Sequence, residues 1–392
     1  MTTTPRPQGL PAPLPGDAVR VVLDPAGTGC MLPADAYTSD DVFAWERRHF
    51  FDRAWVCAGR TNDLVGAGAR RAVRVGNEEV LLVRGTDGVL RGFYNVCRHR
   101  AHELVRCGGP TVTRGAIHCP YHAWTYALDG NLMATPRFEP PPSFDAGEYG
   151  LVPMRLEEWR GFAMVNPSGD AAPLATYLGA FDELLSPWQP ERLVTAASHE
   201  YVLRANWKLS VENYDECYHC SAIHPELCMV SPPDSGWNLE LPGTWVGGWM
   251  RLADHAVTMS MDGASGGVML PGLTDEQRRT VLYVALFPNL LVSAHPDYVM
   301  THRIEPLSAG ETRIECSWMF DPEAVARDDF DPSYAADFWD VVNRQDWDAC
   351  EAVQRGVSSR GYRPGPFSVR EDAVQQFVQL VARAYLAGDL VS

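Results

Sequence analysis

The sequence predicts an α+β protein with two domains, a small all-β domain followed by a larger domain in which helices cover an antiparallel sheet. Its 392 residues suit about two domains. Short alternating apolar runs fill the region from 56 to 165, whereas longer strand-like runs between 279 and 320 are followed by helical patterns. We expect a flexible tail over 1–36, a helix over 37–55, the β domain over 56–165 and the second domain over 166–392.

The composition is that of a globular protein with excess negative charge. Hydrophobic residues make up 46% and charged residues 21%, which is ordinary for such proteins. The 33 basic and 50 acidic side chains give a net charge of -17, which disfavours nucleic acid and anionic membranes as partners. The sequence contains no run of about 18 apolar residues, so we expect no membrane span. Residues 1–16 lack the apolar core of a signal peptide, so we expect a cytoplasmic protein with reduced cysteines.

Residues 37–55 have the pattern of an amphipathic helix, which Thr38 or Ser39 can cap. After it the apolar period changes to that of short strands separated by glycine-containing turns. The expected strands lie at 72–75, 80–83, 89–95 and 157–166, and a short helix is expected at 174–185.

Two mixed pairs of cysteine and histidine lie in the predicted β domain. Cys97 and His99 form a C-x-H motif, and Cys119 and His122 form a C-x-x-H motif after nineteen intervening residues. In a Rieske [2Fe–2S] cluster, two thiolates bind one iron and two imidazoles bind the other. Two turns that each present one cysteine and one histidine therefore suit such a cluster. Structural zinc sites pair like residues instead, as C-x2–4-C and H-x3–5-H. We therefore assign a [2Fe–2S] cluster to these four residues.

With these motifs the chain, from about Leu32 to Leu386, resembles the Rieske non-haem iron oxygenases. Respiratory Rieske proteins usually carry an additional disulfide, but the corresponding positions here are His102 and Tyr121, so the resemblance is to the lower-potential oxygenase type. It implies a homotrimer in which electrons cross between subunits. Electrons from NAD(P)H would come through a separate flavin/iron–sulfur reductase, because no glycine-rich nucleotide-binding motif is visible in the chain.

A second pair of histidines, His219 and His224, lies in the larger domain. Residues five apart on an ideal α-helix point about 140° away from each other, so one metal can hold both only where the helix unwinds. Pro225 supports a helix end at that point. The resemblance implies that these histidines and a distant carboxylate hold a mononuclear Fe(II), in a facial triad with positions left open for O2.

The resemblance also implies the third ligand of this iron. The family places it in a D-x4-E-x2-Q pattern, which Asp346, Glu351 and Gln354 match within a helix expected over 334–357. Asp348 is the alternative, although an exposed acidic helix face explains it as well.

Glu216 precedes His219 by three residues and would share its helix face. In the family an acidic residue here links the iron site to a cluster histidine of the neighbouring subunit, where a carboxylate can accept an imidazole N–H from each side. Asp215 is the alternative and points about 100° away. Most members have Asp at this place, and Glu216 within residues 212–220 resembles the branch that demethylates glycine betaine, carnitine and stachydrine. The Cys217-x-x-Cys220 pair has no matching second pair, so we interpret both as core thiols.

The rest of the larger domain is expected to form loops over 240–270 and three antiparallel strands at 279–293, 298–306 and 312–320. A capping box, Ser368 to Glu371, opens a final helix that ends near Leu386.

Together these features predict a terminal oxygenase that hydroxylates and N-demethylates a quaternary ammonium compound such as glycine betaine. Such a substrate accepts no hydrogen bond at its cationic group, so aromatic faces should bind it. The candidates for this role are Trp207, Trp237, Trp245, Trp249 and Trp318. Two alternatives stay open, an oxygenase of aromatic rings or aryl ethers and an electron-transfer Rieske protein without catalysis.

Overall fold

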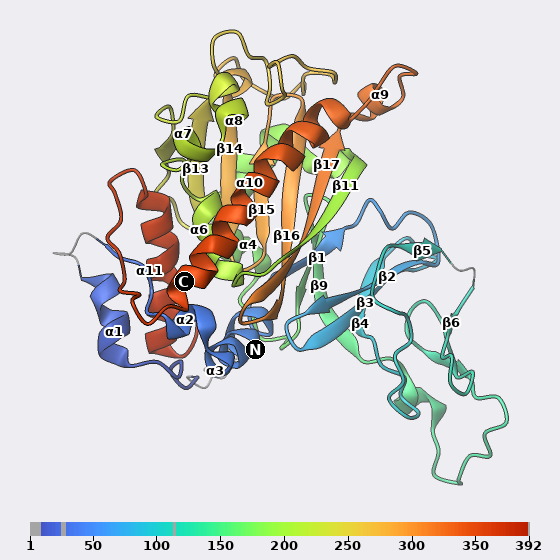
Figure 1. Cartoon of the computed structure of the whole chain (residues 1–392). Helices are drawn as coiled ribbons and strands as arrows, with labels where there is room; N and C mark the ends of the chain where they lie inside the picture. Colours follow the sequence, from blue (N-terminus) through green and yellow to red (C-terminus); the bar gives the residue numbers. More distant parts are fainter. Residues whose placement is uncertain (1–8, 25–28, 113–114, 391–392) are drawn as a thin grey trace. The chain divides into compact units, whose positions relative to one another are not determined.

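The structure is a computed structural model that describes residues 9–24, 29–112 and 115–390. It contains two compact units (Figure 1), of which one spans Phe51–Ala171 and the other joins Met1–Phe50 to Ala172–Ser392. The sequence-based domain limits at 56 and 165 fall inside the first unit. None of the helices in the described ranges is long and apolar enough to cross a membrane.

The unit of residues 51–171 is all-β, as predicted. A seven-stranded sheet has the order β1-β10-β9-β4-β3-β2-β5, and a second sheet has the order β6-β7-β8. The strands are β1 Val56–Arg60, β2 Ala69–Val75, β3 Glu78–Arg84, β4 Leu90–Tyr94, β5 Thr111–Val112, β6 Ile117–His118, β7 Thr125–Tyr126, β8 Leu132–Ala134, β9 Pro153–Trp159 and β10 Phe162–Asn166, with one 3-10 turn, η3 Ala146–Tyr149. Its core contains Phe93, Trp124 and Tyr126 together with the thiols of Cys97 and Cys119.

The single strand predicted over 157–166 is wrong, because the chain reverses there and forms the hairpin β9–β10. Arg160 and Gly161 have φ of 46° and 77°. Two consecutive residues with positive φ make the tight turn that matches the twist of a two-residue hairpin.

The second unit has the predicted architecture of helices on an antiparallel sheet. Its seven strands pair in the order β11-β17-β16-β15-β14-β13-β12. They are β11 Val194–Leu203, β12 Trp237–Asn238, β13 Trp245–Arg251, β14 Thr280–Leu286, β15 Leu290–Ala294, β16 Tyr298–Ser308 and β17 Glu311–Phe320. The helices are α1 Gly16–Arg20, α2 Asp35–Thr38, α3 Asp40–Glu46, α4 Leu174–Leu178, α5 Phe181–Leu185, α6 Trp207–Tyr214, α7 Cys220–Ile223, α8 Pro225–Val230, α9 Pro322–Val325, α10 Ser333–Val357 and α11 Asp372–Ala387, with short turns at η1 Val21–Leu23, η4 Ser186–Trp188, η5 Pro190–Arg192 and η6 Gln277–Arg279.

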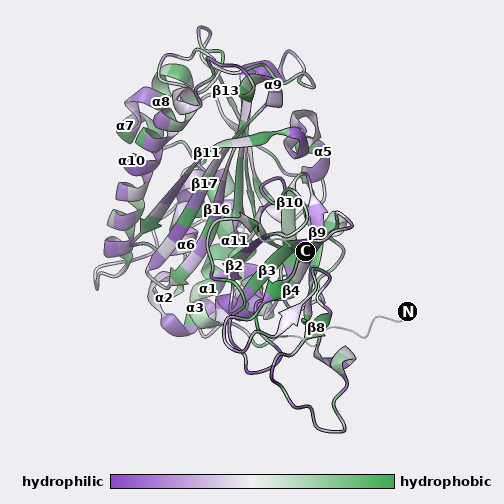
Figure 2. Ribbon diagram, turned by 90° about the vertical axis from the view of Figure 1, so that its right-hand side faces the viewer, coloured by the Kyte–Doolittle hydropathy of each residue, from purple (hydrophilic) through white to green (hydrophobic). Residues whose placement is uncertain are grey.

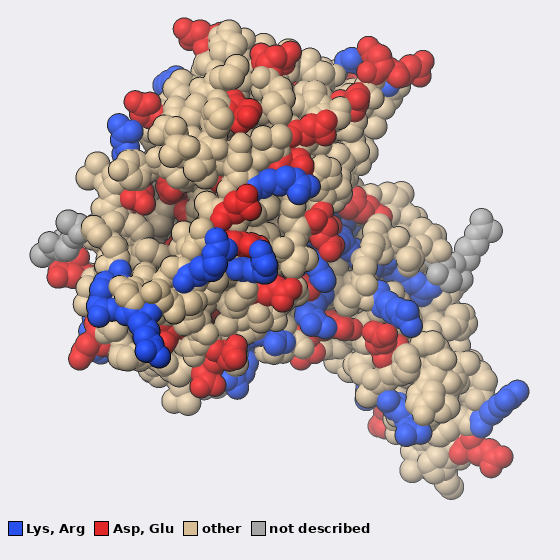
Figure 3. All heavy atoms as spheres, viewed as in Figure 1, with Lys and Arg blue, Asp and Glu red and all other residues tan. Residues whose placement is uncertain are grey.

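Helix α10 is the long helix predicted over 334–357, and it crosses the sheet in Figure 1. Its buried side chains include Phe338, Trp339 and Val342. The ribbon of α10 in Figure 2 carries both hydrophilic and hydrophobic residues, as a helix with one face on a sheet requires. On the face shown in Figure 3, acidic and basic side chains are mixed and not segregated.

The flexible tail predicted over 1–36 is wrong for its described residues, 9–24 and 29–36; the remainder of that range lies outside the described residues. Val19, Val22 and Leu32 are buried. The Ala12 N–H donates to the Tyr385 carbonyl at 2.9 Å, and the Trp45 indole donates to the Leu10 carbonyl at 2.8 Å. Apolar burial and these hydrogen bonds therefore order the segment.

The continuous helix predicted over 37–55 is also wrong. Ser39 has extended backbone and separates α2 from α3, and its hydroxyl caps α3 by accepting the Val42 N–H. After α3 the chain makes a π-helical turn, η2 Arg47–Phe51, and then leaves the helix. The helix predicted over 174–185 is likewise divided, into α4 and α5, at Gly179 with a φ of 54°.

Two further predictions about the larger sheet need correction. Residues 279–293 form two strands, β14 and β15, because Pro288 cannot donate a ladder hydrogen bond. The loops predicted over 240–270 include strand β13, whose two glycines weaken the strand signal. A Cβ at Gly247 would lie 2.1 Å from the Tyr283 carbonyl oxygen, so the close approach of the neighbouring strand requires glycine there.

Candidate metal centres

Cys97 and Cys119 each begin a short loop of the same design in the β unit. The Cys97 carbonyl accepts the N–H of Ala101 at 3.0 Å, and the Cys119 carbonyl accepts the N–H of Ala123 at 3.1 Å. Both alanines have a positive φ, 55° and 58°, which turns the chain back at the end of each loop. Each loop thus presents one cysteine and one histidine, as the spacing predicts.

One ring nitrogen of each histidine in these loops has no hydrogen-bond partner among the described residues. The Nδ1 atoms of His99 and His122 are buried and have no hydrogen-bond partner among the described residues. The two rings lie 4.7 Å apart, and the indole of Trp124 stacks on His99 at 4.7 Å. Buried ring nitrogens need a ligand. Two of them beside two buried thiols fit a Rieske [2Fe–2S] cluster, which these four residues would hold.

The sulfur of Cys97 also has a polar neighbour. The Tyr126 hydroxyl lies 3.2 Å from the Cys97 Sγ and accepts the Arg98 N–H at 3.0 Å. Burial raises the pKa of the Cys119 thiol. This shift disfavours the Cys119 thiolate, and the positive charge of a bound metal would favour it.

His219, His224 and Asp346 meet in the second unit. Their metal-facing atoms lie close together. The Nε2 atoms of His219 and His224 are 3.2 Å apart. The Asp346 Oδ1 atom lies 2.8 Å from Nε2 of His224 and 3.3 Å from Nε2 of His219. The helix unwinds as the spacing requires, because His224, with φ -119° and ψ 69°, separates α7 from α8. Asp346 comes from α10, far along the chain.

The other nitrogen of each imidazole is held by a side-chain oxygen. His219 Nδ1 lies 2.5 Å from Glu216 Oε1, and His224 Nδ1 lies 2.7 Å from Gln345 Oε1. Gln345 in turn donates to Glu226 at 3.2 Å. Such contacts fix the tautomer and direct both Nε2 atoms to one point. Sequence reasoning missed Gln345, and its place beside Asp346 on α10 is the signal that could have found it.

The electrostatics of this group favour a bound cation. Burial lowers the pKa of His219, but the carboxylates of Asp346 and Glu216 outweigh it and raise the pKa to about 9. Burial tends to raise the pKa of Asp346, yet His219 and His224 hold it below its usual value. Two imidazoles and one carboxylate with this attraction for positive charge suit Fe(II), which the three residues would hold.

The neighbouring acidic and amide residues of α10 have other positions. Asp348 is exposed, and it lies outside the group of three. Glu351 accepts the Arg204 N–H at 3.0 Å, and Gln354 accepts the Asn206 N–H at 2.8 Å. These two residues fasten α10 to the chain that leads into α6.

A cavity of about 330 Å³ adjoins the three ligands. Its aromatic lining consists of Tyr214, Tyr218, Trp237, Trp249, Tyr283 and Trp339. Of the five predicted tryptophans, Trp237 and Trp249 line it. Trp207, Trp245 and Trp318 are buried and are not among its lining residues, so the structure gives no support to their predicted role.

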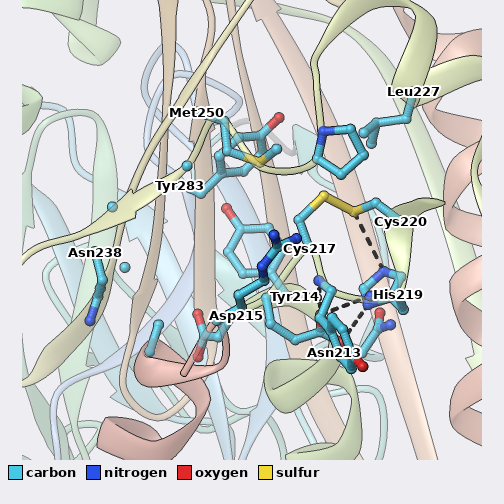
Figure 4. A pocket seen from close by; sticks show the side chains of 18 of the residues that line it. Asn213, Tyr214, Asp215, Cys217, His219, Cys220, Leu227, Asn238, Met250 and Tyr283 are labelled. Atoms are coloured by element: carbon cyan, nitrogen blue, oxygen red, sulfur yellow. Dashed lines mark hydrogen bonds and ion pairs between the residues drawn. A yellow bond between two sulfur atoms is a disulfide. The ribbon is translucent and has the colours of Figure 1, made fainter. Parts of the chain in front are cut away.

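The interpretation of Cys217 and Cys220 as core thiols is also wrong. They form a disulfide that lines the cavity on both sides of His219 along the chain (Figure 4). The loop from α6 to α7 brings the two Cα atoms within 4.9 Å, a spacing that permits the bond.

Comparisons with known proteins identify both domains. Residues 54–147 match the Rieske [2Fe-2S] domain, and residues 190–387 match the catalytic domain of the ring hydroxylating alpha subunit. The glycine betaine monooxygenase oxygenase subunit of Chromohalobacter salexigens is 30% identical over 367 residues, covering 86% of this chain and 81% of the relative. The carnitine monooxygenase oxygenase subunit of Escherichia coli K12 is 32% identical over 340 residues, covering 85% of each.

Solved structures show the same fold. The quaternary ammonium Rieske monooxygenase CntA in complex with L-carnitine superposes with a TM-score of 0.77 at 28% identity, covering 95% of this chain and 99% of the other. Naphthalene 1,2-dioxygenase from Rhodococcus sp. gives a TM-score of 0.78 at 18% identity, covering 95% and 97%.

Proposed function

Since the chain belongs to the Rieske non-haem iron oxygenases, as the terminal oxygenase subunit, we propose that it N-demethylates a quaternary ammonium compound such as glycine betaine. The carrying observation is the cavity beside His219, His224 and Asp346, which is lined by aromatic rings. Aromatic faces attract a cation that offers no hydrogen-bonding atom. The names of the relatives support the same class of substrate.

The enzyme uses O2, and it receives electrons from a separate reductase. We propose that Cys97, His99, Cys119 and His122 hold the cluster and that His219, His224 and Asp346 hold the iron. The cluster delivers electrons and the iron activates O2 when both are bound. Glu216 and Gln345 keep the two iron-facing imidazoles in place, and the aromatic lining excludes water and positions a methyl group of the substrate.

The overall reaction follows from the substrate chemistry. One oxygen atom of O2 enters a C–H bond of an N-methyl group, and the other leaves as water after uptake of two electrons and two protons. The resulting carbinolamine loses formaldehyde, a proton leaves with it, and a tertiary amine remains.

We further propose a homotrimer in which Glu216 faces a cluster histidine of the neighbouring subunit, with Asp215 excluded from that role. The contact between Glu216 and His219 Nδ1 supports this, because Asp215 makes no such contact. A flavin/iron–sulfur reductase and a cytoplasmic location stay predictions. An electron-transfer role without catalysis is wrong, since the chain carries the oxygenase catalytic domain.

The test is turnover by the purified protein, loaded with iron and cluster and supplied with a reductase and NADH. We expect formaldehyde release that depends on glycine betaine or a close quaternary analogue. Turnover of aromatic substrates alone would contradict the proposed substrate class and leave the oxygenase assignment intact.

A further inference from the structure

Asp215 has a buried carboxylate that the proposed machinery does not use. It lies at the end of α6, where its N–H donates to the Val211 carbonyl at 3.0 Å, and it lines the cavity beside Tyr214. Both of its side-chain oxygens are shielded from solvent, and neither has a hydrogen-bond partner among the described residues. Figure 4 shows Asp215 on the side of the pocket away from the Cys217–Cys220 disulfide.

Other buried carboxylates of the same unit are satisfied. Glu46 accepts hydrogen bonds from Lys208, Trp207 and Tyr385. Asp297 accepts them from Thr258, Ser265 and Tyr334. A buried carboxylate without donors is costly, so Asp215 is an exception that calls for a function.

No lysine or arginine of the cavity lining pairs with Asp215 in the described part of the chain. Arg370 is the single lysine or arginine among the residues that line the cavity, and its side chain is exposed. The other unpartnered polar groups of the lining, the amide of Asn238 and the hydroxyl of Tyr283, are neutral. The iron position at His219, His224 and Asp346 is the other source of positive charge in this cavity, and a cationic group of a bound molecule can supply the partner that Asp215 lacks.

We propose that the Asp215 carboxylate is the negative counter-charge for the quaternary ammonium group of the substrate. This inference rests on the proposed function and names the residue that sets its charge specificity. The aromatic rings favour a cation through cation–π attraction, and Asp215 adds a full opposite charge that strengthens the preference for a trimethylammonium head over an uncharged tert-butyl head of nearly the same shape.

The electrostatic cost in the empty pocket agrees with this role. Burial, and in second place the charge of Glu212, raises the pKa of Asp215 well above its ordinary value. A bound cation reverses part of that cost because it stabilises the ionised carboxylate. The ionised carboxylate of Asp215 is therefore costly in the empty protein and is stabilised in the complex with a cation.

The test compares ligands that differ in charge alone. Binding to the holoenzyme is measured by calorimetry for glycine betaine against 3,3-dimethylbutanoate and for choline against 3,3-dimethylbutanol. In each pair a carbon replaces the quaternary nitrogen. Wild type should prefer the cationic member of each pair, and Asp215→Asn should reduce that preference by about tenfold or more, through loss of the cationic ligand's affinity.

Asp234→Asn is the matched control, because it removes the same formal charge from an exposed position in the same lining. It should keep the wild-type preference. An equal preference in wild type and Asp215→Asn, or an equal loss in both variants, would overturn the role of Asp215 while leaving the proposed function standing. Failure of wild type to bind any quaternary compound would overturn both.

A structural role for Asp215 is tested by thermal unfolding without ligand. Replacing an unpartnered buried carboxylate with a neutral amide of the same shape should leave the melting temperature unchanged or raise it. A second variant, Asp215→Ser, should give the same result and the same loss of preference. Marked destabilisation of both variants would overturn the proposal, because it would show that the carboxylate supports the fold.

Discussion

In the unit of residues 51–171, the four proposed cluster ligands come from two loops that are close in sequence and share one hydrogen-bonding design. In the other unit, the residues that meet around the iron position come from segments 122 residues apart. The two sites also differ around their histidines. The Nδ1 atoms of His99 and His122 lack partners, whereas Nδ1 of His219 and of His224 each contacts a side-chain oxygen.

This difference shows how each site is made rigid. A loop whose backbone is closed on itself can present its ligands without help from other side chains. Ligands assembled across α7 and α10 need neighbouring oxygens to fix the rings. The iron site should therefore respond in a graded way to changes in those neighbours, and its variants should leave the cluster unaffected.

The largest expected effect comes from the ligand that the fold brings in from afar. Asp346→Ala should abolish formaldehyde release, because the iron loses its carboxylate, yet the visible spectrum of the cluster should persist. Asp348→Ala is the matched control on the exposed face of α10 and should keep full activity. If Asp348→Ala lost activity and Asp346→Ala kept it, Asp348 and not Asp346 would be the iron ligand.

Glu216→Gln changes the side chain whose oxygen contacts Nδ1 of His219. The amide keeps an acceptor for the imidazole N–H but removes the charge, so turnover should fall by about 10- to 100-fold with both metals retained. Glu216→Asp should recover much of the activity, because it restores a carboxylate. Steady-state rates and iron content are the measurements, and a Gln variant as active as wild type would contradict the assigned role.

Gln345→Leu removes the oxygen that holds His224. We expect iron affinity to weaken by about tenfold, with a smaller effect on the rate at saturating iron. Gln345→Glu keeps an acceptor and should bind iron more tightly than the leucine variant. Titration of the metal-free protein with Fe(II) measures both, and equal affinities in all three proteins would show that His224 needs no partner.

Glu212→Gln should have the smallest effect on activity and should change only the pH dependence of stability. Burial raises the pKa of Glu212 from 4.5 to about 7 in the folded protein. Between these values the folded state keeps a proton that the unfolded state releases, so stability is greatest below pH 4.5 and falls by up to ~3 kcal/mol as the pH rises through 7. The glutamine variant should lose less stability between pH 5 and 8 than wild type, as measured by melting temperatures. An unchanged pH profile would place the titration elsewhere.

Sequence patterns predicted the parts that depend on local structure. The loops at Cys97 and Cys119, the long helix α10 and the break between His219 and His224 each follow from spacing or period over a few turns. The hairpin at Arg160 and the strand containing Gly247 did not follow, because their residues are unusual for those conformations and contacts elsewhere in the chain decide them.

The lining of the substrate cavity was the least predictable part. A tryptophan in the core and a tryptophan in a pocket have the same local sequence signal, so Trp207 and Trp249 could not be separated before the sheet was known. Gln345 and the unpartnered state of Asp215 likewise depend on what the fold places opposite them.

The central claim, that one chain holds two independent iron centres, is tested most directly by counting iron. Wild type should contain three irons per chain, and Cys119→Ala should retain one while losing the cluster spectrum. Two irons per chain in wild type, all lost together with the cluster in Cys119→Ala, would contradict the account.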